Sequence, residues 1–386
     1  MVEETNADVF EGGPTAEELT QWGDDFDYIR DVFTRDGLEL KVKRVCRSPY
    51  SWLTLVLPEG PVGNNAAVAR MCRSLSGDTT VRGLYASLPQ TPYVGIETAR
   101  SGADGSAIGK ICERARWRNA ANEDNGLPLP VGVDVMGDDT IIDLSHMSHL
   151  FIFGGDTMAQ GELVRPMLKA LLDCRDSSQL ELYAVDGAAG QFNGICSNVR
   201  NRIPHGKDNP HVGDEEALCW CREVKQGLEA FVAAKGVREE LLKRELCDSI
   251  EEYNAEHRNK LSRSVFFLSD IPRMGTDGDS QVSNAISEVE DLIADLVCED
   301  IQRLGFHFVW VQFDLSDISG LQNPVQSVIR GRDSDVRSGC IVHNSMFDEA
   351  DLLMNFGGME PYGKLHGSCF YANPNNEVTR IYLAEA

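Results

Sequence analysis

Long apolar runs are missing from this chain of 386 residues. No stretch of about 18 consecutive apolar residues occurs, and a membrane-spanning helix needs that length. The first residues, MVEETNADVFEGG, are acidic and polar, whereas a secretory signal peptide begins with basic residues followed by an apolar segment. The sequence therefore predicts a cytoplasmic protein without a membrane partner.

Closely spaced cysteine pairs are also missing. The 11 cysteines are scattered, and none of them belongs to a C-x-x-C pair of the kind that binds zinc. Free thiols are the usual state of cysteine in the cytoplasm. Cys219 and Cys221 would point apart if they lie on a helix. We expect reduced cysteines that mostly fill the core, and their spacing predicts no metal site.

Basic residues are scarce relative to acidic ones. The chain has 36 Lys and Arg against 61 Asp and Glu, which gives a formal net charge of −25. A protein that holds nucleic acid by its phosphates gathers Lys and Arg on the contacting face. The composition therefore disfavours DNA binding and favours a solvated acidic surface. A local basic patch inside an acidic shell stays open as an alternative.

The chain does contain enough apolar sequence, 42% of its residues, for two folded domains. Residues 1–15 are acidic and contain Gly and Pro, which predicts a disordered lead-in. A small α/β domain is predicted for residues 16–118, with a helix at 16–35, a strand pair within 38–57, a helix at 64–76 and a closing strand at 93–97. The polar stretch 119–125 separates it from a second domain, residues 119–386.

Short apolar runs alternate with helical patterns in the second domain. Nearly continuous runs are typical of strands buried on both faces of a mainly parallel sheet, and they occur at 150–153, 181–185, 265–268 and 306–311. The clearest helix is predicted at 282–304, where apolar residues recur on one face. The alternation predicts an α/β fold with helices on both faces of the sheet.

A series of segments carries a family resemblance. In chain order they are TPYVGIET, LPLPVGVDVMGDDTIIDLSHMSHLFIFGG, ALCWCREV, IEEYN, VEDLIADL, DISGL, ADLLMNFGGM and KLHGSCFY. Together they resemble the motor portion of FtsK/SpoIIIE-type DNA translocases, from about Leu38 to the C-terminus. The resemblance implies a RecA-like P-loop NTPase fold, preceded by a small α/β domain like the pre-motor domain of that family. It also implies assembly into a hexameric ring.

The segment after the run at 150–153 stands where this family has its phosphate-binding loop. Such a loop needs G-x-x-x-x-G-K-[ST], because backbone N–H groups and Lys hold the phosphates and the hydroxyl holds Mg²⁺. The aligned residues here are Gly154, Gly155, Asp156, Thr157, Met158, Ala159, Gln160 and Gly161. The second glycine, the Lys and the hydroxyl are all replaced. Asp156 and Glu162 add negative charge that opposes phosphate binding.

The strand that should supply the catalytic acid groups is altered too. Asp270 stands at the position of the family's Mg²⁺-orienting Asp, but Ile271 replaces the Glu that polarises the attacking water. After the run at 306–311, Asp314 replaces an Arg of the family pattern, and Asp317 adds charge to a loop that faces DNA in the family. Arg337 matches loosely a residue that the family sends to a neighbouring subunit's site.

The resemblance and these replacements together predict a pseudo-ATPase. It would be a scaffold or regulatory subunit of a DNA-translocation, secretion or conjugation assembly, in a homo- or hetero-oligomeric ring, beside an active FtsK-type ATPase. No cofactor is expected in this case.

Two alternatives stay open, so whether the chain is an enzyme is open as well. One is an ATP- and Mg²⁺-dependent translocase of double-stranded DNA with an unorthodox site, which would need a basic group such as Arg165 brought to the loop at Gly154. The other is a DNA-binding module without hydrolysis, which the acidic Asp314 and Asp317 disfavour.

Overall fold

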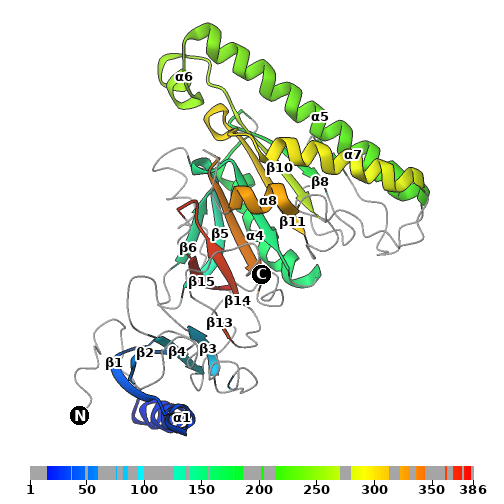
Figure 1. Cartoon of the computed structure of the whole chain (residues 1–386). Helices are drawn as coiled ribbons and strands as arrows, with labels where there is room; N and C mark the ends of the chain where they lie inside the picture. The colour runs from blue at the N-terminus through cyan, green and yellow to red at the C-terminus, as the bar shows by residue number, and fades with distance from the viewer. Residues whose placement is uncertain are drawn as a thin grey trace.

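The structure, a computed structural model, contains two β-sheets with helices packed on them (Figure 1). It describes residues 15–35, 37–47, 51–59, 75, 81–85, 94–99, 126–134, 139–154, 157–176, 178–185, 201–203, 214–269, 280–312, 322–329, 336–343, 361–362, 368–375 and 378–383. The predicted lead-in (except Thr15), the helix at 64–76 (except Leu75) and the polar stretch 119–125 lie outside the described residues. No helix in the described part combines the length and the apolar character needed to cross a membrane.

The first helix, α1 (Ala16–Arg35), is the one predicted at 16–35. It begins with a capping box, in which the Thr15 hydroxyl accepts a hydrogen bond from the Glu18 N–H (3.2 Å) and the Glu18 carboxylate accepts one from the Thr15 N–H (2.9 Å). Phe26, Ile29 and Phe33 recur at helical spacing and are buried against the smaller sheet. Thr15 therefore belongs to the folded part of the chain.

The smaller sheet is antiparallel and has the strand order β1-β2-β4-β3-β13. Its strands are β1 (Glu39–Arg47), β2 (Ser51–Glu59), β3 (Val81–Tyr85), β4 (Val94–Ala99) and β13 (Pro361–Tyr362). The predicted strand pair within 38–57 is confirmed by the pairing of β1 with β2. β13 comes from far along the chain, within the residues assigned to the second domain. The domain limits 16–118 and 119–386 stay a prediction.

The larger sheet has the order β6-β5-β15-β14-β12-β7-β11-β10-β8-β9. Its parallel part runs from β12 to β9, and the other strands are antiparallel. The bounds are β5 (Pro128–Asp134), β6 (Asp139–Asp143), β7 (His149–Phe153), β8 (Leu180–Val185), β9 (Asn201–Ile203), β10 (Arg263–Ser269), β11 (Phe306–Gln312), β12 (Ser338–His343), β14 (Ser368–Ala372) and β15 (Val378–Leu383). The four predicted runs are β7, β8, β10 and β11, and β11 lies between β7 and β10.

Both faces of the parallel part are covered, as the sequence predicts. Alternate residues of β7 and β11 point to opposite faces. Leu150 and Val309 pack in one core with α4 (Thr157–Cys174). Phe151 and Trp310 pack in the other core with α5 (Asp214–Glu245), α7 (Ser280–Val297) and α8 (Gln322–Ile329). Figure 1 shows α5 and α7 side by side. Burial of each such side chain contributes about 1.5–3 kcal/mol, so these cores position the strand ends firmly.

The prediction of one helix over 282–304 was wrong at its C-terminal end. Helix α7 ends at Val297, and a short 3₁₀ helix, η4 (Gln302–Leu304), follows after a turn. The hydroxyl of Ser148 accepts hydrogen bonds from the backbone N–H groups of Ile301 and Gln302, both at 3.2 Å. Because these N–H groups bond to a distant side chain, the helix ends before them even though the apolar spacing continues.

Two glycines are expected to respond to alanine in opposite ways. Gly305 has φ 72°, and an added Cβ would overlap the buried Cδ1 of Ile250. Gly305→Ala should therefore lower the free energy of unfolding by roughly 1–3 kcal/mol. Gly236 lies inside α5 with open space around its Cβ position, so Gly236→Ala should raise it by about 0.5–1 kcal/mol. Urea unfolding of both variants checks the pair, and shifts in the same direction would contradict it.

Candidate nucleotide-binding site

The carboxyl ends of three parallel strands meet at one edge of the larger sheet. In register, Gln312 at the end of β11 lies beside Phe153 of β7, and Ser269 at the end of β10 lies beside Val311. The chain leaves β7 towards β8 on one side, whereas β12 lies on the other side of β7. Ligands of open α/β sheets bind at the carboxyl edge where the connections diverge in this way. The aligned loop therefore starts at the expected place in the fold.

Gly154 begins that loop in a conformation that favours glycine. Its φ is 84°, in the left-handed region, and its backbone N–H donates a hydrogen bond to the carbonyl of Gln312 at 3.0 Å. This bond joins the end of β7 to the end of β11. Gly155 and Asp156 lie outside the described residues. The strand, the glycine turn and the following helix thus occur in the order that a phosphate-binding loop needs.

Helix α4 begins at Thr157, so the predicted loop residues Thr157, Met158, Ala159, Gln160 and Gly161 form the backbone of its first turns. The helix continues through Pro166, which lacks the N–H that would bond to the preceding turn.

Two basic residues of α4 are candidates to replace the missing phosphate-binding Lys. Arg165 and Lys169 are exposed. They lie about 12 and 18 Å along the helix axis from its first residue, because an α-helix rises about 1.5 Å per residue. Neither backbone position is near the loop.

The remaining predicted site residues follow two buried strand ends. Ser269 and Gln312 are buried. Asp270 and Ile271, which come directly after Ser269, lie outside the described residues, as do Asp314 and Asp317. The structure brings the two strand ends together beside Gly154, and the chemical roles assigned to the residues that follow stay predictions.

Arg337 lies at the opposite edge of the sheet. It is exposed and directly precedes β12, and its carbonyl accepts a hydrogen bond from the Ser148 N–H at 2.8 Å. Since β12 is parallel to β7, the length of a six-residue strand, about 20 Å, separates Arg337 from the carboxyl edge. Any role for Arg337 at a nucleotide site would have to be in a neighbouring subunit.

Two buried histidines at this amino edge are absent from the sequence prediction. His149 donates to the Glu299 carbonyl (3.1 Å) through Nε2, and His307 donates to the Met147 carbonyl (2.8 Å) through Nδ1. Burial lowers the pKa of His149 to about 4. Burial, assisted by the positive charge of Arg263, lowers the pKa of His307 to about 3. Both rings are therefore neutral at neutral pH.

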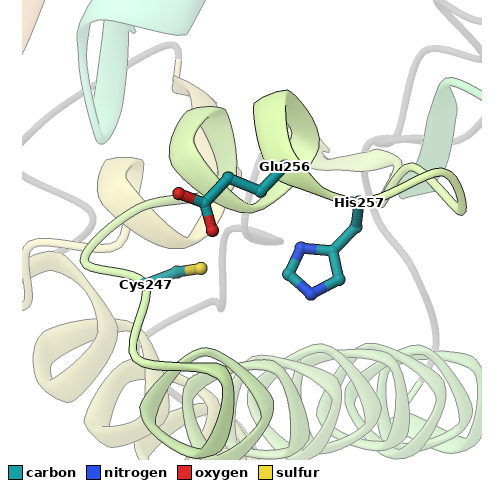
Figure 2. A group of neighbouring side chains, drawn as sticks. All are labelled: Cys247, Glu256 and His257. Carbon is teal, nitrogen blue, oxygen red and sulfur yellow. The ribbon is translucent and has the colours of Figure 1, made fainter.

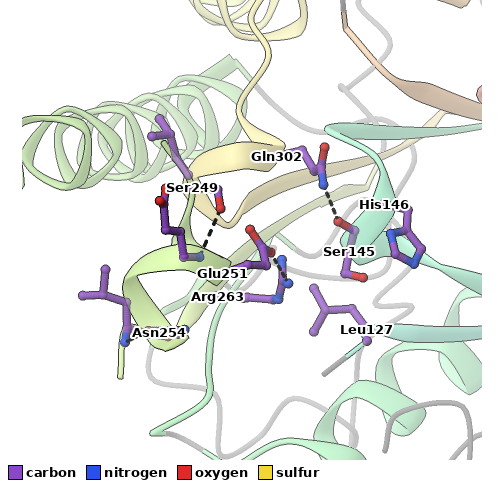
Figure 3. A network of polar contacts seen from close by, with 12 residues as sticks. Leu127, Ser145, His146, Ser249, Glu251, Asn254, Arg263 and Gln302 are labelled. Atoms are coloured by element: carbon purple, nitrogen blue, oxygen red, sulfur yellow. Dashed lines mark hydrogen bonds and ion pairs between the residues drawn. The ribbon is translucent and has the colours of Figure 1, made fainter. Parts of the chain in front are cut away.

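A polar network lies at this amino edge, and Figure 3 shows two of its contacts, Glu251 with Arg263 and Gln302 with Ser145. The Arg263 guanidinium pairs with the Glu251 carboxylate at 2.6 Å and lies 3.4 Å from Nε2 of His307. The Gln302 amide donates to the Ser145 carbonyl at 2.9 Å. The network connects η4, β10, β11 and α6 (Ile250–Glu256) with the turn before β7. It holds the amino ends of the strands and lies away from the candidate nucleotide edge. A His inside an otherwise apolar strand is the signal in the sequence that points to it.

Comparison with models of known protein families identifies the family of this chain. The model described as "FtsK/SpoIIIE family" matches residues 110–303, which is half of the chain. The chain belongs to the FtsK/SpoIIIE family. The fold agrees with this membership, because the α/β order with β11 between β7 and β10 is that of a RecA-like P-loop NTPase sheet.

Curated relatives of this FtsK/SpoIIIE-family chain are longer than it is. It is 23% identical over 347 residues to the DNA translocase FtsK of Caldanaerobacter subterraneus subsp. tengcongensis, covering 87% of the chain and 45% of the relative. It is 26% identical over 155 residues to the DNA translocase FtsK of Haemophilus influenzae, covering 39% of the chain and 28% of the relative. The chain thus spans less than half the length of the curated relatives it matches.

A solved structure supports the fold over nearly the whole chain. The monomer form of the pCW3 conjugation coupling protein TcpA with ATPγS has a TM-score of 0.54 to this FtsK/SpoIIIE-family chain and is 13% identical. The match covers 94% of this chain and 95% of TcpA. At this identity the likeness establishes the fold alone.

Proposed function

We propose that this FtsK/SpoIIIE-family chain is a pseudo-ATPase that acts as a scaffold or regulatory subunit. One observation carries the proposal: the strand ends and the Gly154 turn that would surround a nucleotide are formed, while the residues that would bind and hydrolyse it are replaced in the sequence. The framework of strand ends and glycine turn fits a role in assembly. The replacement of the Lys, the hydroxyl and the catalytic Glu fits a subunit that does not hydrolyse ATP.

The replacements act on every step of ATP hydrolysis. Gln160 cannot neutralise a phosphate, and each lost hydrogen bond to a charged group removes about 1.5–3 kcal/mol of binding. Gly161 has no hydroxyl for Mg²⁺. Ile271 cannot act as a base towards water, and the loss of such a group lowers the rate by about 10²–10⁴-fold. From the three replacements together we expect both binding and turnover to fall below ordinary detection.

The names of the relatives suggest the assemblies in which such a subunit would work. They include DNA translocases and a conjugation coupling protein. We propose a cytoplasmic location and a homo- or hetero-oligomeric ring, with an intact FtsK-type ATPase as the neighbour in the hetero-oligomeric case. The net charge of −25 favours contacts with proteins over contacts with DNA phosphates.

A nucleotide titration and a turnover assay test the proposal together. The purified chain is titrated with a fluorescent ATP analogue and Mg²⁺, and phosphate release is measured with and without duplex DNA. We expect no saturable binding below about 1 mM, which corresponds to a binding free energy weaker than about −4 kcal/mol, and no release above background.

One result would restore the DNA translocase alternative. Phosphate release that duplex DNA stimulates, and that Asp270→Ala abolishes, would show that Asp270 still orients Mg²⁺ at a working site. Binding of duplex DNA without any release would instead favour the DNA-binding module.

A further inference from the structure

Three potential metal ligands meet where α5 turns into α6. Cys247 lies in the turn after α5, Glu256 is the last residue of α6, and His257 is the residue that caps it. One ligand atom of each lies within 4.8 Å of those of the other two. Figure 2 shows the thiol, the carboxylate and the imidazole around a common space. The three side chains supply sulfur, oxygen and nitrogen donors, the set that Zn²⁺ uses in proteins.

The turn that presents Cys247 is sharply defined. Leu246 has φ 59°, a left-handed conformation that is unusual for a leucine, and its side chain is 89% exposed. The Cys247 N–H then donates to the Leu242 carbonyl at 3.0 Å, which folds the chain back over the end of α5. Cys247 is buried as a result. The unusual conformation at Leu246 thus places the thiol beside the end of α6.

The ring of His257 is held in place by two contacts with Tyr253. Its Nδ1 donates to the Tyr253 carbonyl at 3.0 Å, and its ring stacks on the Tyr253 ring with centroids 3.9 Å apart. Since Nδ1 carries the proton, the lone pair of Nε2 is available. Donation of one ring N–H to a backbone carbonyl is the usual arrangement that fixes a metal-binding histidine.

Glu245 lies beside that available nitrogen. Its Oε2 is 3.7 Å from Nε2 of His257, and its Oε1 is held by the Arg244 Nε at 3.0 Å. The 3.7 Å separation is longer than a hydrogen bond. It is close to the spacing of about 3.4 Å between two ligands of a tetrahedral ion with bonds of about 2.0–2.1 Å. Glu245 therefore lies next to His257, beside the group of three residues whose ligand atoms lie within 4.8 Å of one another.

The surroundings of the thiol carry an excess of negative charge. The carboxylates of Glu256, Glu252, Glu245 and Asp248 all act electrostatically on Cys247. The Cys247 thiol donates a hydrogen bond to the Glu245 carbonyl, with 3.7 Å between Sγ and O. A divalent cation would offset this negative charge and bring the donor atoms together.

We propose that Cys247, Glu256 and His257 form a zinc-binding site that joins the end of α5 to α6, with Glu245 close enough to His257 to turn in as the fourth ligand. The site goes beyond the proposed pseudo-ATPase function and does not depend on it. The ligands follow the pattern C-x₈-E-H, which is none of the familiar cysteine-pair spacings, so the sequence alone predicted no metal site.

Metal titration of the full chain tests the site. After treatment with a chelator, the chain is titrated with Zn²⁺ in competition with a chromophoric indicator. It is then titrated with Co²⁺, whose charge-transfer absorption reports a thiolate ligand. We expect one equivalent of tightly bound Zn²⁺. Cys247→Ser and His257→Gln should each weaken binding by more than the roughly 10–100-fold that loss of an outer-shell partner causes.

Matched variants separate this site from ordinary cysteine chemistry. Cys298→Ser changes an exposed cysteine just after α7 and should retain full Zn²⁺ affinity. Zn²⁺ should raise the midpoint of thermal unfolding of the parent chain and of Cys298→Ser, but not that of Cys247→Ser. If Cys247→Ser fails to fold, Glu256→Gln provides the same comparison, because Glu256 is exposed. Zn²⁺ binding that survives in both Cys247→Ser and His257→Gln, or no binding by the parent, would overturn the proposal.

Discussion

A triple variant that restores the phosphate-binding residues, Ala159→Gly, Gln160→Lys and Gly161→Ser, is expected to bind Mg²⁺-ATP about 100-fold more tightly than the parent chain. The reason is that the framework is already formed: Gly154 has its left-handed φ, its N–H bonds to Gln312, and α4 begins at Thr157. Two hydrogen bonds from the new Lys to phosphate, at about 1.5 kcal/mol or more each, account for that factor.

The measurement is a titration of the triple variant with a fluorescent ATP analogue, followed by anisotropy. A variant with the same added charge on the exposed face of α5, Gln226→Lys, is the control and should bind no better than the parent. Equal affinity of the triple variant and this control would mean that the carboxyl edge is not a nucleotide site. Turnover should stay absent until Ile271→Glu is added, because the base towards water is still missing.

Acidification is expected to lower the free energy of unfolding by about 4 kcal/mol between pH 7 and pH 5. The pKa of His149 is lowered to about 4 and that of His307 to about 3, from an ordinary value of 6.5. Below pH 6.5 the unfolded chain therefore takes up protons that the folded chain does not. This difference in proton binding hardly changes the free energy of unfolding above pH 6.5. As the pH falls towards the folded pKa values it lowers the free energy of unfolding, by about 2 kcal/mol per histidine at pH 5.

Urea unfolding at pH 7 and pH 5 checks this prediction. His307→Gln, although less stable than the parent at both pH values, should lose only about half as much stability between them. His146→Gln is the matched control, because the side chain of His146 is 63% exposed, and it should keep the full pH dependence. The positive charge of Arg263 lowers the pKa of His307, whereas the negative charge of Asp143 raises it. A pH dependence of the same size in all three chains would place the titrating groups elsewhere.

Much of the larger sheet could be predicted because its strands are short apolar runs separated by helical patterns. β7, β8, β10 and β11 lie at or very near the predicted positions. The end of α7 could not be predicted in this way. Ile301 and Leu304 are buried at helical spacing, and the hydroxyl that interrupts the helix belongs to Ser148, about 150 residues earlier. Local periodicity contains no information on such a distant partner.

The candidate site could also be predicted only in part, for the same reason. The loop at Gly154 and the ends of β10 and β11 can be located from motif positions, because parallel strands bring their carboxyl ends to one edge. The histidine network and the group of Cys247, Glu256 and His257 depend instead on which elements pack together. Their residues are of ordinary types at ordinary spacings, and only the tertiary structure makes them neighbours.

The pairing of β13 with β3 has a mechanical consequence. The chain passes from β4 of the smaller sheet to β5 of the larger one, returns from β12 to the smaller sheet as β13, and goes back to the larger sheet as β14. Three covalent crossings therefore join the two sheets. A single linker would leave the two sheets free to rotate about each other, whereas three separate connections restrict that rotation. A force applied to α1 and its sheet should thus reach the larger sheet at β5, β12 and β14, and not at one point alone.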